Sequence, residues 1–191
     1  PAAARGFDFA AMAADVMTDC PDLRLCLTQG FSELPNDPRF VRLEDLLSRT
    51  PRASVSALDE IRIDPSDPAL FLLSGGTTGI PKLIPRTHND YLYNSRVAAE
   101  ACEIGVGDVL LDVLPIEHNL PLGCPGLQGF LLSGGTVVLG TSTRPRDVFE
   151  LIQRHRVTHI HLVPALLIRW IDDPLVREFD LSSVRVIQSG G

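Results

Sequence analysis

The order of apolar and polar positions along the chain predicts helices and strands that take turns. Helical spacing of apolar residues marks a short piece at 43–49 and longer segments at 7–19, 88–104, 122–134, 146–156 and 165–173. Short apolar runs bounded by turn residues predict strands at 23–29, 69–74, 109–115, 136–140, 158–164 and 184–188. This alternation is typical of an α/β fold with largely parallel sheets and flanking helices.

Local patterns refine this outline. The unbroken apolarity of residues 69–74 predicts a buried strand. Thr87 followed by Asp90 matches the [ST]xx[DE] capping box, which predicts the start of a helix. Residues 30–67 are rich in Pro, Asp and Ser, so we expect a connecting region there with only the short helical piece inside it.

Composition narrows the class of protein. The 191 residues are 45% hydrophobic, which is enough for one sizeable core or two small ones. A net charge of −7 gives no basic surface, so we expect neither nucleic acid nor an anionic membrane as a partner. Four cysteines without a CxxC pair suit a reducing compartment, and we expect the cytoplasm. The chain has no initiator Met and stops on a Gly pair after a predicted strand, so we expect it to be part of a longer protein.

The strongest chemical signal follows the predicted strand at 69–74. Its candidate phosphate ligands are Ser74, Gly75, Gly76, Thr77, Thr78, Gly79 and Lys82. Glycines let backbone N–H groups converge on an anion, hydroxyls donate to phosphoryl oxygens, and a lysine adds a mobile charge. The loop is neither a Walker A motif, since Leu83 follows Lys82, nor a GxGxxG fingerprint. A plain strand-to-helix turn would also use glycines, but the hydroxyl cluster with its lysine favours phosphate binding.

This stretch resembles a known family. SGGTTGIPK is similar to the phosphate-binding motif of the adenylate-forming superfamily, which includes acyl- and aryl-CoA ligases, luciferases and the adenylation domains of peptide synthetases. The longer string LFLLSGGTTGIPKLIPRTHNDYLY, followed by LPIEHN, resembles the stand-alone aryl-acid AMP ligases of siderophore biosynthesis. The resemblance runs over about 67–191, whereas residues 1–66 carry no diagnostic motif. It implies that 1–191 is a fragment of the N-terminal AMP-binding domain, without the C-terminal domain and its catalytic lysine.

The resemblance also implies a reaction. An aryl acid would attack ATP in the presence of Mg²⁺ to give an aryl-AMP, which then passes to the phosphopantetheine thiol of an aryl carrier protein. The glycine- and hydroxyl-rich loop would bind the triphosphate, an arrangement that suits the positioning and charge stabilisation of phosphoryl transfer. Gly190 and Gly191 would contact the adenine. Because the catalytic lysine is expected outside this chain, we do not expect the chain alone to adenylate efficiently.

A second segment, HNLPLGC at 118–124, carries the implied acid pocket. In the family the His-Asn pair lines the acyl site, so His118 would shape the wall and Asn119 would face an ortho hydroxyl. Cys124 stands where salicylate-specific members tend to carry cysteine and 2,3-dihydroxybenzoate-specific members serine. A thiol is a poorer partner than a serine for a 3-hydroxyl, by about 1 kcal/mol, which favours salicylate with 2,3-dihydroxybenzoate next. The alternatives are a turn-capping Asn119 and a Cys124 that only fills space.

The remaining histidines do not predict a metal site. His155 falls on a predicted helix, while His159 and His161 fall on the next strand, so we expect structural imidazoles and no metal. His88 begins a helix and is expected to order the exit of the loop. Two other functions stay open on the sequence alone: an aryl- or acyl-CoA ligase, and a non-catalytic nucleotide-binding module.

Overall fold

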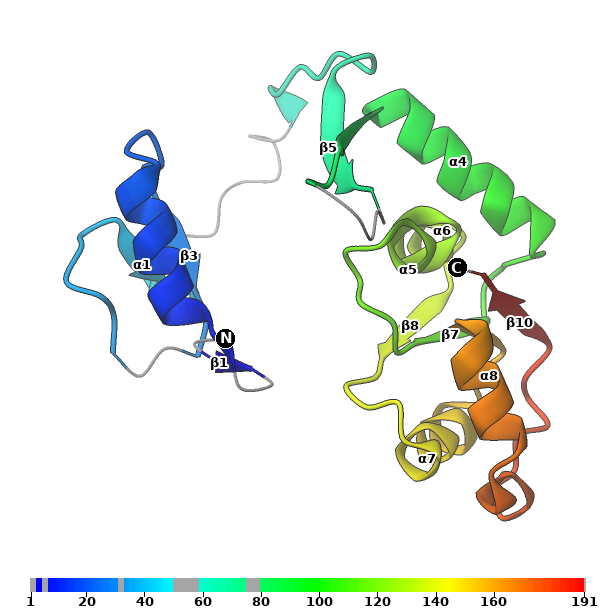
Figure 1. The fold of residues 1–191 in the computed structure, drawn as a ribbon. Helices are drawn as coiled ribbons and strands as arrows, with labels where there is room; N and C mark the ends of the chain where they lie inside the picture. Colours follow the sequence, from blue (N-terminus) through cyan, green and yellow to red (C-terminus); the bar gives the residue numbers. More distant parts are fainter. Residues whose placement is uncertain (1–2, 5–6, 31–32, 50–58, 75–79, 191) are drawn as a thin grey trace. The chain divides into compact units, whose positions relative to one another are not determined.

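A computed structural model describes residues 3–4, 7–30, 33–49, 59–74 and 80–190 (Figure 1). The chain divides into two compact units, Pro1–Arg62 and Ile63–Gly191. None of the helices in the described ranges has the length and apolarity needed to cross a membrane.

The first unit is built from short elements. Among its described residues these are β1 (Ala3–Ala4), β2 (Phe7–Asp8), α1 (Phe9–Asp19), β3 (Cys26–Thr28), β4 (Phe40–Arg42) and α2 (Leu43–Arg49). Helix α1 begins at Asp8, whose carboxylate accepts hydrogen bonds from the N–H groups of Ala10 and Ala11. Strands β3 and β4 pair in parallel. Strand β4 lies in the stretch predicted to be connecting, so that prediction was wrong at Phe40–Arg42.

The second unit holds strands and helices that alternate along most of its length. They are β5 (Pro68–Leu73), β6 (Leu83–Thr87), α4 (His88–Ala101), β7 (Val109–Asp112), α5 (Asn119–Gly123), α6 (Gly126–Leu132), β8 (Thr136–Leu139), α7 (Pro145–His155), β9 (His159–Leu162), α8 (Pro164–Ile171), the 3-10 turn η1 (Pro174–Arg177) and β10 (Val186–Ser189). The sequence did not predict β6 or η1. Four strands form a parallel sheet in the order β10-β9-β7-β8. The predicted α/β class with flanking helices is confirmed.

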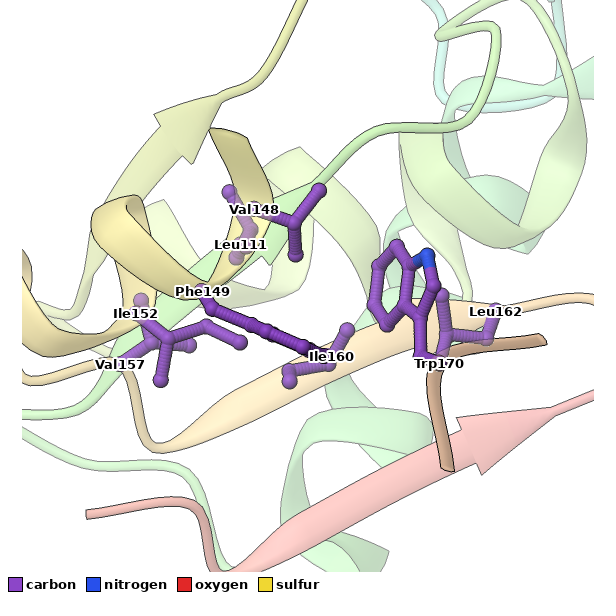
Figure 2. Packing of buried hydrophobic residues seen from close by; sticks show 8 residues of the cluster. All are labelled: Leu111, Val148, Phe149, Ile152, Val157, Ile160, Leu162 and Trp170. Atoms are coloured by element: carbon purple, nitrogen blue, oxygen red, sulfur yellow. The ribbon is translucent and has the colours of Figure 1, made fainter. Parts of the chain in front are cut away.

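One face of this sheet packs on α7 and α8. The apolar cluster there contains Leu111, Val148, Phe149, Ile152, Val157, Ile160, Leu162 and Trp170 (Figure 2). Full burial of each large side chain is worth about 1.5–3 kcal/mol, so this cluster is a main source of stability for the unit. The Trp170 indole N–H is satisfied by the carbonyl of Thr143 at 3.1 Å.

The other face packs on the layer of α4, α5 and α6. Phe130 of α6 is fully buried and meets the ring of His159 edge-on, with 5.1 Å between ring centroids. Side chains alternate between the faces of a strand, so His159 and His161 both point to this layer while Ile160 and Leu162 point to the apolar cluster. The two faces of β9 therefore differ in chemistry, polar toward α4–α6 and apolar toward α7 and α8.

Two sequence expectations were wrong in this unit. Strand β5 is not a buried strand: it pairs antiparallel with β6, and Phe71 and Leu73 are 56% and 65% exposed. The helix expected over 122–134 is broken into α5 and α6. Pro125 has no N–H to extend α5. Gly126 takes a positive φ of 46°, and an added Cβ there would overlap with the carbonyl oxygen of Pro121, so the position requires glycine.

Candidate functional site

The predicted phosphate loop connects β5 to β6, and two hydrogen bonds between Ser74 and Lys82 join its two ends. The N–H of Lys82 donates to the Ser74 hydroxyl at 2.9 Å, and the N–H of Ser74 donates to the Lys82 carbonyl at 3.0 Å. The predicted residues between them, Gly75, Gly76, Thr77, Thr78 and Gly79, lie outside the described residues. Lys82 is exposed, so its ammonium group is not desolvated by the protein. The structure thus describes the two ends of the loop, Ser74 and Lys82, which are hydrogen-bonded to each other.

Strand β6 connects the end of this loop to α4. The Thr87 hydroxyl accepts a hydrogen bond from the N–H of Asp90 at 3.1 Å, so the predicted helix cap is confirmed. The Asp90 carboxylate accepts from Arg86, and this hydrogen bond lowers the pKa of Asp90. The N–H of His88 donates to the carbonyl of Asp67 at 3.2 Å, which ties the start of α4 to the chain just before β5.

The predicted acid-pocket residues lie where the loop after β7 enters α5. His118 is the residue before the helix, is exposed, and makes no side-chain capping bond. Asn119 is the first helical residue, and its Oδ1 is buried without a hydrogen-bond partner. A buried unsatisfied amide oxygen costs about 1–3 kcal/mol. Because Asn119 Oδ1 accepts no hydrogen bond, this oxygen does not cap the turn. A hydroxyl group of a ligand could donate to it.

A cavity of about 620 Å³ opens beside His118. Its lining residues are Leu114, Pro115, His118, Leu120, Pro121, Val163 and Gly190. Three of them, Leu114, Val163 and Gly190, lie one or two positions after the carboxyl ends of strands β7, β9 and β10, the edge of a parallel sheet at which ligands characteristically bind. The volume is in the range of small-molecule sites, about 300–1,000 Å³. The lining brings together His118 and Gly190, which the sequence assigned to the acid and adenine subsites respectively, but it does not include Ser74, Lys82, Asn119 or Cys124.

Cys124 occupies the corner between α5 and α6. Just before it, the carbonyl of Gly123 accepts from Asn94 Nδ2 at 2.7 Å and from Ser95 Oγ at 2.8 Å. The carbonyl of Cys124 itself accepts from Gln188 Nε2 at 3.0 Å. Side chains from α4 and β10 therefore fix the backbone of this corner, while the thiol remains partly buried.

Tyr91 fills the space between α4 and this corner. Its side chain is only 3% exposed, and a Cβ added to Gly123 would lie 2.6 Å from the phenol carbon and oxygen. Burial raises the pKa of Tyr91, and its hydroxyl has no hydrogen-bond partner. The sequence analysis missed Tyr91, Asn94 and Ser95, although their three- and four-residue spacing on α4 places them on one helical face.

The three histidines considered as metal ligands lie in different surroundings. His155 is exposed on α7, whereas His159 is buried with Nε2 3.3 Å from the carbonyl of Cys102. Because a carbonyl only accepts, Nε2 carries the proton of the neutral ring, and burial lowers the pKa of His159. His161 faces Asp112 at 3.6 Å. Across the described ranges, no group of three or more His, Cys, Asp or Glu side chains is placed to hold a metal ion.

Comparison with known proteins places this geometry in context. The chain is 40% identical to the vibriobactin-specific 2,3-dihydroxybenzoate-AMP ligase of Vibrio cholerae over 99% of its length and 33% of that protein. It is 41% identical to the salicyl-AMP ligase / salicyl-S-ArCP synthetase of Mycobacterium tuberculosis over 98% of its length and 32% of that protein. The chain thus spans about a third of the curated relatives that it matches.

A solved structure and a family model also match this chain. The apo structure of Mycobacterium smegmatis MbtA matches with a TM-score of 0.79 and 39% identity, covering 95% of this chain and 32% of that one. The family model described as AMP-binding enzyme matches residues 15–191, which is nearly the whole chain. The resemblance read from the glycine-rich loop is therefore confirmed at the level of the family: the chain belongs to the AMP-binding enzymes, and its relatives at about 40% identity include aryl-acid AMP ligases.

Proposed function

We propose that the protein containing this chain activates an aryl carboxylic acid with ATP to form an aryl-AMP, in siderophore biosynthesis. One observation carries the proposal most directly: His118 and Gly190, assigned to different subsites from separate motifs, line the same cavity at the carboxyl edge of the parallel sheet. When the acid and ATP are held in one cleft, the carboxylate can attack the α-phosphate of ATP and displace pyrophosphate without a further diffusional encounter, which is how binding energy lowers the barrier of a two-substrate reaction. The names of the relatives support the same reaction class.

The loop closed by Ser74 and Lys82 is the proposed triphosphate site, together with Gly75, Gly76, Thr77, Thr78 and Gly79. The Ser74 oxygen accepts the Lys82 N–H, so its own O–H remains able to donate to a phosphoryl oxygen. Gly190 and Gly191 are the proposed adenine contacts. Mg²⁺ would accompany ATP, but the described side chains form no dedicated metal site and we assign no step to it.

The proposed acid is salicylate first and 2,3-dihydroxybenzoate second. The unpartnered Oδ1 of Asn119 suits an ortho hydroxyl donor, and a site built to bond a hydroxyl rejects analogues that lack it. The Cys124 thiol is a weak partner for a 3-hydroxyl, which favours the acid without one. The proposed acceptor is the phosphopantetheine thiol of an aryl carrier protein.

The test is acid-dependent exchange of pyrophosphate into ATP by the full-length protein, with benzoate as the matched acid that lacks the ortho hydroxyl. We expect salicylate to be used well and benzoate poorly, and Asn119→Ala to reduce that discrimination. Cys124→Ser should shift the ratio of kcat/KM values toward 2,3-dihydroxybenzoate by about fivefold, the value of one neutral hydrogen bond. Exchange that does not depend on any aromatic acid would contradict the proposal, and an unchanged ratio would remove Cys124 from it.

A second assay separates the acceptors. Coenzyme A and an aryl carrier protein with a free phosphopantetheine thiol compete for the same aryl-AMP, and we expect the carrier protein to be acylated faster, with release of AMP. A faster reaction with coenzyme A would instead assign the protein to the aryl-CoA ligases. The chain of residues 1–191 alone should show little exchange activity, since it spans only about a third of the length of its relatives. We also propose a cytoplasmic location, in which the free thiols would stay reduced.

A further inference from the structure

A row of polar side chains crosses the sheet just below the cavity. The strand register pairs Asp112 of β7 with His161 of β9, and His161 with Gln188 of β10. Each member of the row stands two positions before a residue of the cavity lining: Leu114, Val163 and Gly190. Neighbours in register on parallel strands point to the same face, so the row forms one continuous polar layer under the proposed site.

Asp112 and His161 are an unusual pair within this row. Their side chains are 0% and 2% exposed, and Asp112 Oδ2 lies 3.6 Å from His161 Nδ1. Neither atom makes a hydrogen bond, so the two groups face each other at ion-pair distance alone. A carboxylate without access to water is costly unless a donor faces it, so the ring nitrogen of His161 is the group that compensates Asp112.

The second oxygen of Asp112 reaches the cavity wall. Asp112 Oδ1 accepts a hydrogen bond from the N–H of Leu114 at 3.1 Å, which shapes the turn that leaves β7. One carboxylate thus contacts both the strand end of β9, through His161, and the first lining residue of the cavity. On the other side of His161, Gln188 links β10 to the carbonyl of Cys124 at 3.0 Å.

We infer that Asp112 and His161 are positioning residues for the aryl-acid cavity: His161 holds the Asp112 carboxylate, which in turn fixes the wall at Leu114. Neither Asp112 nor His161 lines the cavity, so the pair acts through the turn after β7. The inference rests on the proposed function, since it assigns the pair to the acid side of that site. It predicts that disrupting the pair weakens use of the acid and leaves use of ATP unaffected.

The same two strands offer a matched control at their opposite ends. Asp108 directly precedes β7, and its Oδ1 lies 4.0 Å from His159 Nδ1, so this pair resembles the Asp112–His161 pair. The Asp108 carboxylate is held instead by Arg185 and by the N–H of Gly105, and no residue of this second pair lines the cavity. Asp108→Asn therefore removes a similar charge from the same strand without reaching the turn at Leu114.

The experiment compares three variants of the full-length protein by pyrophosphate exchange. Asp112→Ala/His161→Leu replaces the pair by apolar side chains, which avoids leaving one charge buried alone. Asp112→Asn keeps an oxygen for the N–H of Leu114, and Asp108→Asn is the control. We expect the double variant to raise the KM for salicylate about fivefold, the size of one lost hydrogen bond, with the KM for ATP changed less than about twofold. Asp112→Asn should keep both KM values within about twofold of the parent, as should Asp108→Asn.

Amide hydrogen exchange at Leu114 gives a readout that does not depend on the reaction. Exchange should be faster in the double variant and remain slow in Asp112→Asn and Asp108→Asn. An unchanged KM for salicylate in the double variant, or an equal rise in both KM values, would overturn the inference. If the parent protein shows no salicylate-dependent exchange of pyrophosphate, the proposed function fails, and the Leu114 amide alone then decides whether the pair holds this wall.

Discussion

Adding one methyl group at Gly123 tests how tightly the corner before Cys124 is held. In Gly123→Ala the new carbon would lie 2.6 Å from the phenol carbon of Tyr91 and 2.8 Å from its Cε1. Carbon atoms in contact are normally about 3.5–4.0 Å apart, so the overlap is about 1 Å. The ring is enclosed, and the Gly123 carbonyl receives hydrogen bonds from Asn94 and Ser95, so neither side can retreat without losing contacts.

The expected cost is that of overpacking, about 1–3 kcal/mol of unfolding free energy. A small domain has about 5–15 kcal/mol in total, so the effect is measurable. Gly105→Ala is the matched control, because no atom lies within 4 Å of its added Cβ and its φ is not left-handed. That control should be neutral or stabilising, by up to about 1 kcal/mol.

Urea unfolding followed by tryptophan fluorescence measures both variants. The sequence has a single tryptophan, Trp170, which lies in the core of the second unit and therefore reports on the unit that holds Gly123. Free energies come from linear extrapolation. Adding Tyr91→Leu should recover part of the loss, as a coupling energy in a double-mutant cycle. If Gly123→Ala proves as stable as Gly105→Ala, the packing argument for this corner is wrong.

Other measurements test the cap, a buried histidine and the core. Thr87→Ala should lower the unfolding free energy by about 1 kcal/mol, while Thr87→Ser, which keeps the acceptor, should not; equal losses would contradict the capping role. Burial lowers the pKa of His159, so the folded state favours the neutral ring; its stabilisation is complete above the unfolded value of about 6.5 and is lost as pH falls through the folded pKa. The melting temperature should therefore fall between pH 7.5 and 5.5, and less steeply in His159→Gln; an identical slope would refute this. Phe149→Ala should cost about 3–5 kcal/mol, whereas the exposed Ile168→Ala should stay within about 0.5 kcal/mol; similar losses in urea unfolding would contradict the assigned core.

Local signals in the sequence predicted much of the second unit. The helix expected at 146–156 is α7, and the strand expected at 158–164 contains β9, because amphipathic spacing and short apolar runs are local properties. Strand β5 was located correctly, but its burial was not. An apolar run reports that a strand is suited to burial, and it carries no information on which element covers each face.

The proposed site residues Ser74, Lys82 and His118 come from short continuous strings of the sequence. The hydrogen bonds between Ser74 and Lys82 were not predicted, because they depend on the pairing of β5 with β6. The contact of Asp112 with His161 depends on β7 and β9 being neighbours, although β8 lies between them in the chain. Strand order and register are global properties, so no local pattern marks such a pair.

The strand order also has a consequence for synthesis on the ribosome. Strand β7 lies between β8 and β9, and the N–H of Val109 is satisfied by Thr158, which is 49 positions later in the chain. At about 5–20 residues per second, the apolar segment VLLD therefore emerges several seconds before its second neighbour exists. For that interval one side of a hydrophobic strand is open to wrong pairing. The nascent chain should thus be most dependent on chaperones after β8 has appeared and before residue 162 has left the exit tunnel.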